Sequence, residues 1–283
     1  MKKKFSASAF KFGVSLFAAG VILAAATPAS AEEWSDTSIG YRYGTKFAEP
    51  FNGNDISKNI INFTHVGGYK YGTNFINLDL LQSDNKDPAA SSGGAQEAYL
   101  VYRNTVDFGK VFGTDLKYGY IRSYGATVGF DWNTKNDTGY SSKKRMLVFG
   151  PTLMLDVPGF LNTSLLMLSE SNQPVGVSSR YTYRLHPMLD VAWGIPLGDT
   201  KFAFEGYFDY IGAKGQNEFG GGTAPETHFD GKLMYDLSSL VNAGKNTFRL
   251  GVEYEYWRNK FGNLASVKGS LAKTPMVRAE YHF

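Results

Sequence analysis

Ionisable and aromatic residues recur between apolar residues in several short segments, and these are the side chains that could do chemistry. The candidates for binding a solute are Asp79, Glu97, Arg103, Glu205, Tyr207, Asp209, Arg249 and Glu253. Carboxylates, guanidinium groups and phenol rings gathered on one polar surface could hold a small planar polar solute by stacking and hydrogen bonding. The alternative is that the same charges pair with one another and serve the fold alone.

The histidines and glycines do not predict catalysis. His65, His186, His228 and His282 fall in different segments, and the sequence has no Gly-x-Ser-x-Gly elbow and no His-Glu-x-x-His pair. The glycine clusters at residues 93–94 and 220–222 have no following helix, so they indicate flexible loops rather than phosphate cradles. We therefore expect no catalytic residue, no metal site and no cofactor.

The elements that must position the candidates are strands, because apolar residues alternate with a period of two from Glu32 onward. Twelve segments of roughly ten residues have the length that crosses a bilayer as a tilted strand. They cover residues 37–47, 59–69, 74–83, 94–104, 116–130, 146–157, 161–170, 187–196, 201–210, 227–236, 247–257 and 274–283. The phase of this alternation predicts one charged face, formed by Asp79, Glu97, Arg103, Asp190, Glu205, Asp209, Asp230, Lys232, Arg249, Glu253, Glu255, Arg278 and Glu280.

The first 31 residues read as a secretory signal peptide. Lys2, Lys3 and Lys4 precede an apolar stretch over residues 12–26, and the small-residue site at 29–31 follows. Cleavage after Ala31 would remove four lysines and no acidic residue, which leaves 25 basic and 26 acidic residues. The mature chain then has no basic surface for nucleic acid, and the absence of cysteine suits an oxidising envelope.

The composition of residues 32–283 predicts an all-β fold, a transmembrane antiparallel up-and-down barrel of 12 strands. The full chain of 283 residues has 15% aromatic residues, 32 glycines and a mean hydropathy of -0.26. Strands that alternate a lipid face with a wet face average to such modest values. Closure is required because an open sheet edge in hydrocarbon would leave backbone groups unpaired at several kcal/mol each.

The connections and the last strand support the same prediction. Tight turns are expected at residues 158–159 and 197–199, and longer loops at residues 83–94, 131–144, 171–184 and 212–225. An even number of strands puts both termini on the periplasmic side. The terminal Phe283 follows Tyr281 and Ala279 on one face, like the aromatic strand that barrel-insertion machinery reads. We expect a monomer in the outer membrane of a Gram-negative bacterium, in contact with its lipid.

Several stretches resemble the Tsx family of nucleoside-specific channel-forming outer-membrane proteins. The stretches keep their order from the third strand to the eighth: residues 71–79 (YGTNFINLD), 83–84 (SD), 94–99 (GAQEAY), 101–103 (VYR), 129–133 (GFDWN), 150–152 (GPT), 156–159 (DVPG) and 192–196 (AWGIP). The resemblance implies a narrow twelve-stranded channel that binds nucleosides through aromatic and ionisable lumen residues. It also implies relatives whose loops serve as phage receptors.

The leading interpretation is therefore a substrate-selective outer-membrane channel for passive diffusion of nucleosides or similar small polar solutes. Two alternatives stay open: a non-specific small porin, and a plugged structural or receptor barrel that acts through its external loops. An enzyme is the least favoured class, because a lipid-modifying barrel would need a Ser-His pair at one rim.

Overall fold

The computed structural model describes residues 32–89 and 93–283. The predicted signal peptide, residues 1–31, lies outside the described residues. Residues 32–283 form one compact unit. Among the described residues, no helix is long and apolar enough to cross a membrane.

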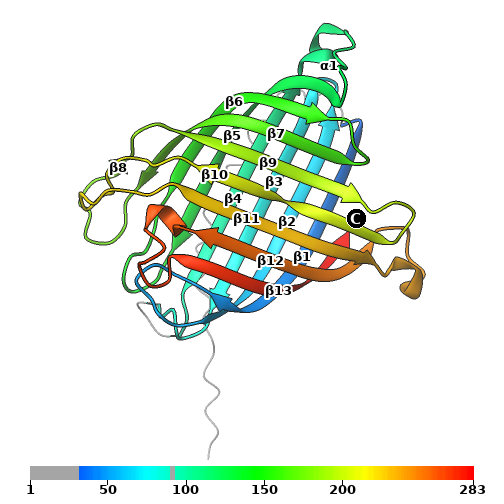
Figure 1. The fold of residues 1–283 in the computed structure, drawn as a ribbon. Helices are drawn as coiled ribbons and strands as arrows, with labels where there is room; N and C mark the ends of the chain where they lie inside the picture. The colour runs from blue at the N-terminus through cyan, green and yellow to red at the C-terminus, as the bar shows by residue number, and fades with distance from the viewer. Residues whose placement is uncertain (1–31, 90–92) are drawn as a thin grey trace, which may run out of the picture. The chain divides into compact units, whose positions relative to one another are not determined.

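Twelve long antiparallel strands close into a barrel (Figure 1). The strands are β1 (Trp34–Phe47), β2 (Ile56–Tyr69), β3 (Gly72–Ser83), β4 (Gln96–Asp107), β5 (Ile121–Lys135), β6 (Arg145–Leu155), β7 (Phe160–Asn172), β9 (His186–Pro196), β10 (Phe202–Ile211), β11 (Glu226–Asp236), β12 (Phe248–Arg258) and β13 (Leu271–His282). Each pairs with its neighbour along the chain, and β1 pairs with β13 from Ser38↔His282 to Gly44↔Met276. The predicted closed all-β barrel of 12 strands is confirmed, and each predicted segment overlaps one of these strands.

Three short elements lie in the connections. The two-residue strand β8 (Tyr181–Thr182) pairs only with the end of β7. The 3-10 helices η1 (Ser238–Val241) and η2 (Lys260–Gly262) follow β11 and β12. These elements sit at the barrel ends and add nothing to its wall (Figure 1).

The predicted strand over residues 116–130 was wrong at both ends. The chain first forms the helix α1 (Phe108–Phe112), because the Asp107 side chain accepts hydrogen bonds from the backbone N–H groups of Gly109 and Lys110. Gly113 ends the helix in the left-handed region, at φ 63°. β5 begins only at Ile121 and continues to Lys135, into residues that were predicted to be loop.

The outward face of the barrel is an apolar band. Ile61, Val252 and Val277 point outward at mid-strand and are 56%, 58% and 55% exposed. A water-soluble sheet would bury such residues, whereas hydrocarbon solvates them. The barrel therefore spans a membrane. Antiparallel barrels with an even number of strands and such a band are those of bacterial outer membranes, so the expected localisation holds.

Both chain ends emerge at the same rim, as an even strand number requires. The connections at that rim include the two-residue turn between β2 and β3 and the loop that carries α1. The connections at the other rim include the stretch with β8 and the stretch with η2. We call the first the terminal rim and the second the loop rim.

Candidate functional site in the barrel lumen

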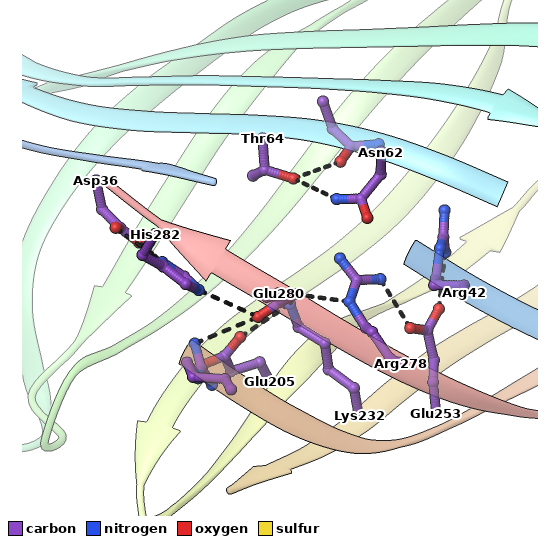
Figure 2. Close-up of polar contacts among 12 residues, drawn as sticks. Asp36, Arg42, Asn62, Thr64, Glu205, Lys232, Glu253, Arg278, Glu280 and His282 are labelled. Atoms are coloured by element: carbon purple, nitrogen blue, oxygen red, sulfur yellow. Dashed lines mark hydrogen bonds and ion pairs between the residues drawn. The ribbon is translucent and has the colours of Figure 1, made fainter. Parts of the chain in front are cut away.

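Charged side chains of β1, β3 and β10–β13 form one continuous ion-pair network inside the barrel (Figure 2). We call it the β13 network. Its members are Arg42, Asp79, Glu205, Lys232, Arg249, Glu253, Arg278 and Glu280. The side chains reach past their neighbouring strands, since Arg42 on β1 contacts Asp79 on β3 and Glu253 on β12.

Carboxylates in the β13 network are bridged between two cations. Glu253 accepts hydrogen bonds from Arg42 and from Arg278, each at 2.7 Å. Glu280 accepts from Lys232 Nζ at 2.7 Å and from Arg278 Nε at 2.6 Å. Glu253 is 3% exposed and Glu280 is 2% exposed. These groups are too well paired and too deeply buried to be free solvent-facing charges, so they fill and brace this side of the lumen.

A second set of ion pairs lies toward the loop rim. Glu49, in the loop after β1, accepts from Lys58 Nζ at 2.7 Å. Lys135 Nζ and Lys260 Nζ lie 3.4 and 3.5 Å from the same carboxylate. Burial alone would raise the pKa of the Glu49 carboxyl, but Lys260, Lys58 and Lys135 outweigh it and hold that pKa well below its usual range.

A matching cluster occupies the other side of the loop rim. Lys214 Nζ lies 2.8 Å from Glu170 and 3.2 Å from Glu226, and Lys144 Nζ lies 3.2 Å from Glu170. Lys214 belongs to the loop between β10 and β11. Burial would lower the pKa of its ammonium, but Glu170 and Glu226 outweigh burial and raise that pKa.

Between these two levels lies a polar stretch that we call the mid-lumen wall. Along β11 the inward residues run Lys232, Asp230, His228 and Glu226, from the β13 network to the loop-rim cluster. His228 stacks on Trp257 with ring centroids 4.0 Å apart and planes at 10°. Tyr207 meets the His228 ring edge-on, with its hydroxyl 3.3 Å from Nε2.

The opposite wall brings its own aromatic and charged groups to this level. On β4 and β5, Arg103 binds Asp131, and the Tyr99 hydroxyl donates to the same carboxylate at 3.3 Å. Arg103 lies close enough to Asp190 on β9 for a Coulombic interaction. Charged groups of the two walls therefore lie at the same level of the lumen.

One sector of the lumen is apolar, which the sequence pattern did not predict. Val148, Leu166, Leu168 and Met188 form a buried cluster on the inward face of β6, β7 and β9. The expectation of a lumen lined by charges of both signs holds for the other strands and is wrong for this sector. These side chains pack against one another and fill this sector of the lumen.

All eight candidate binding residues lie on the inward face. Arg42 brings Asp79 and Glu253 together, and Arg249 pairs with Glu205. Tyr207 and Asp209 lie on the mid-lumen wall, and Arg103 lies across from them. Glu97 is set apart toward the loop rim, where Lys58 lies 3.6 Å away and Asn133 donates to it at 2.6 Å. That these residues bind a solute stays a prediction.

Several lumen residues were missed from the sequence, and three of them contact predicted residues. Arg42, Asp131 and His228 each complete a contact that a predicted residue makes. Arg42 stands between Tyr41 and Tyr43 in a strand, so its phase could have identified it. His228 carries no such signal, because its stack on Trp257 depends on strand register.

In residues 32–89 and 93–283, no group of three or more His, Cys, Asp or Glu side chains is arranged to hold a metal ion. The lumen offers carboxylates in ion pairs and aromatic rings in stacks. Such a surface can recognise a solute by charge, hydrogen bonding and stacking.

Comparison with solved structures finds other barrel proteins of low sequence identity. The KdgM porin has 11% identity, with 87% of this chain and 99% of that one covered, at a TM-score of 0.44. OccAB3 of Acinetobacter baumannii has 8% identity, coverage of 88% and 98%, and a TM-score of 0.39. The translocator domain of the autotransporter NalP from Neisseria meningitidis has 15% identity, 88% of both chains covered, and a TM-score of 0.38.

No protein-family model matches the chain, and no curated protein matches it. TM-scores below 0.5 assign neither a solute nor site residues to this chain.

Proposed function

We propose that the protein is a substrate-selective outer-membrane channel for passive diffusion of nucleosides or similar small polar solutes. The observation that carries the proposal is the mid-lumen wall. There the stacked His228 and Trp257 rings and Tyr207 lie between two braced ion-pair levels. A planar base can stack on such rings while its sugar hydroxyls bond to carboxylates.

The deciding measurement is single-channel conductance of the purified protein in planar bilayers. Nucleosides are added, with free sugars and amino acids as controls. Current steps that nucleosides block and the controls leave unchanged support the proposal. Steps that respond equally to every solute indicate a general porin.

Replacement of the mid-lumen rings should remove the selectivity. We expect Trp257→Ala to weaken nucleoside block by roughly tenfold, because base–aromatic stacking contributes about 1–3 kcal/mol per base. Tyr41→Ala is the matched control, since Tyr41 is an exposed aromatic on the outward face. Unchanged block in Trp257→Ala would contradict the proposed binding wall.

A plugged barrel is the second candidate, and the burial of the β13 network favours it. Side chains such as Glu253 leave water little access on that side of the lumen. Such a barrel would act through the loop rim, for instance as a surface that phage bind. It predicts a silent bilayer with nucleosides present or absent.

A further inference from the structure

The mid-lumen wall holds more carboxyl groups than basic side chains that pair with them. Asp190 on β9 lies directly opposite Asp209 on β10, and Asp230 on β11 lies directly opposite Glu255 on β12. Opposite side chains have Cβ atoms about 4.5–5.5 Å apart, and like charges placed so are destabilising. A wall that keeps two such pairs side by side therefore has an electrostatic cost that the fold alone does not need.

The basic groups near this wall are already engaged. Arg103, on the opposite wall, binds Asp131 on the neighbouring strand β5, and His228 Nε2 lies 3.7 Å from Glu255. The guanidinium groups of Arg42 and Arg278, which act on Asp230 at longer range, are bonded to Glu253. No basic side chain among residues 32–89 and 93–283 forms an ion pair with Asp190, Asp209 or Asp230.

Asp230 is the observation that points to a ligand. It is only 8% exposed, its inward neighbours across the sheet are Tyr207 and Glu255, and no described side chain donates a hydrogen bond to it. In addition, the carboxyl group of Asp209 has only that of Asp190 within hydrogen-bonding range, and no described basic side chain pairs with either. A buried carboxylate without a partner is costly, so Asp230 has acceptor capacity that a ligand can use.

The neighbouring rings indicate which kind of cation fits. Among the described residues no metal-binding arrangement occurs, and two of the acidic pairs' neighbours are the Tyr207 ring and the His228–Trp257 stack. Organic cations favour aromatic faces next to carboxylates, because the ring quadrupole attracts the cation while the carboxylate pairs with it. A flat amidinium or guanidinium group matches both features.

We propose that Asp190, Asp209 and Asp230, together with Tyr207 and the His228–Trp257 stack, form a binding site for planar organic cations. The inference rests on the proposed channel and narrows its solute class to small polar molecules with a cationic end. A solute enters with its cationic group toward Asp209 and Asp230 and its ring against Trp257.

The test is isothermal titration of the detergent-solubilised outer-membrane protein with three isosteres that differ in charge. Benzamidine is cationic, benzamide is neutral and benzoate is anionic. We expect benzamidine to bind at least tenfold more tightly than benzamide, and benzoate not to bind. Equal binding of benzamidine and benzamide, or no binding of benzamidine, overturns the proposal.

Two single variants locate the site. Asp230→Asn and Asp209→Asn should each weaken benzamidine binding by tenfold or more and leave the weak benzamide binding unchanged. Asp199→Asn, in the exposed turn between β9 and β10, is the matched control and should bind like the unmodified protein. The heat-dependent shift in electrophoretic mobility shows that each barrel is closed. Unchanged benzamidine binding in both lumen variants overturns the proposal.

Bilayer recordings separate this inference from the proposed function. A conducting pore should prefer cations in a salt gradient, and Asp230→Asn should move the reversal potential toward zero. If no current is recorded but benzamidine still binds more tightly than benzamide, the proposed channel is contradicted and the proposed cation site is supported. If the protein conducts but binds benzamidine and benzamide equally, the proposed channel is supported and the proposed cation site is rejected.

Discussion

Glu253 shows how single residues hold the lumen in shape. It is buried and accepts hydrogen bonds from two guanidinium groups, Arg42 and Arg278. Its loss would leave both cations buried with an incomplete set of partners. A residue of this kind braces the barrel whether or not it also meets a solute.

We therefore expect Glu253→Gln to lower the free energy of unfolding by about 3–5 kcal/mol, the usual cost of breaking a buried ion pair. Urea denaturation in lipid vesicles measures the change. Glu33→Gln is the control, because Glu33 forms an exposed pair with Lys110 and such pairs contribute about 0–1 kcal/mol. An equal decrease in the free energy of unfolding for the two substitutions would mean that the β13 network does not stabilise the barrel.

The stability that Glu49 contributes at the loop rim should depend on pH. Its pKa is lowered on folding by Lys260, Lys58 and Lys135. A lowered carboxyl pKa contributes stability above the unfolded value, near 4.5, and the contribution is lost as the pH falls through the folded pKa. Between about pH 5 and pH 2, the unmodified protein should lose more stability than Glu49→Gln does. An equal loss of stability in the two proteins over this pH range would show that Glu49 does not cause the pH dependence.

At the scale of the strand, the outward face should tolerate charge according to depth. Val252 lies in the middle of β12 and faces lipid, whereas Leu271 lies at the start of β13. Val252→Arg should destabilise the barrel by about 2–4 kcal/mol, and Leu271→Arg by about 0–1 kcal/mol. The same vesicle denaturation measures both, and equal costs would contradict the assigned bilayer depth.

The alternation along each strand predicted which residues face the lumen. It did not predict which of those residues form ion pairs with one another. Alternation placed Asp79 and Glu253 on the inward face because a side chain's face depends only on its own strand. Their common partner Arg42 depends on closure, which brings β1 beside β13. The apolar sector was missed because residues 165–168 of β7 are apolar on both faces, so a period of two has no contrast there. The capped turn at α1 was missed because Asp107 could equally end a strand.

At the scale of the whole molecule, everything depends on the seam between β1 and β13. Tyr41 pairs with Ala279 across it, and both residues face outward. The chain contains no cysteine, so an introduced pair reports on this seam alone. Antiparallel neighbours of this kind have Cα atoms about 4.5–5.5 Å apart, within the range that a disulfide spans.

The double variant Tyr41→Cys with Ala279→Cys should form an intramolecular disulfide in the folded barrel, because the seam holds the two Cα atoms within bridging range. Electrophoresis of the unfolded chain without reductant should then show faster migration. Tyr41→Cys with Phe204→Cys is the control, since Phe204 faces outward on β10, which pairs with β9 and β11 and not with β1. A crosslink in the control, or none in the seam pair, would contradict the closure.

The seam between β1 and β13 also determines when the barrel can close. Among the barrel strands β1 is synthesised first and its partner β13 last. One edge of β1 therefore stays unpaired until β13 has been synthesised. Pairing between such distant segments is slow to form, and an open strand edge invites association with other chains. The interval between the first and last strand is thus a period of vulnerability, and the cell must keep the unfinished chain apart from its neighbours until the final residues arrive.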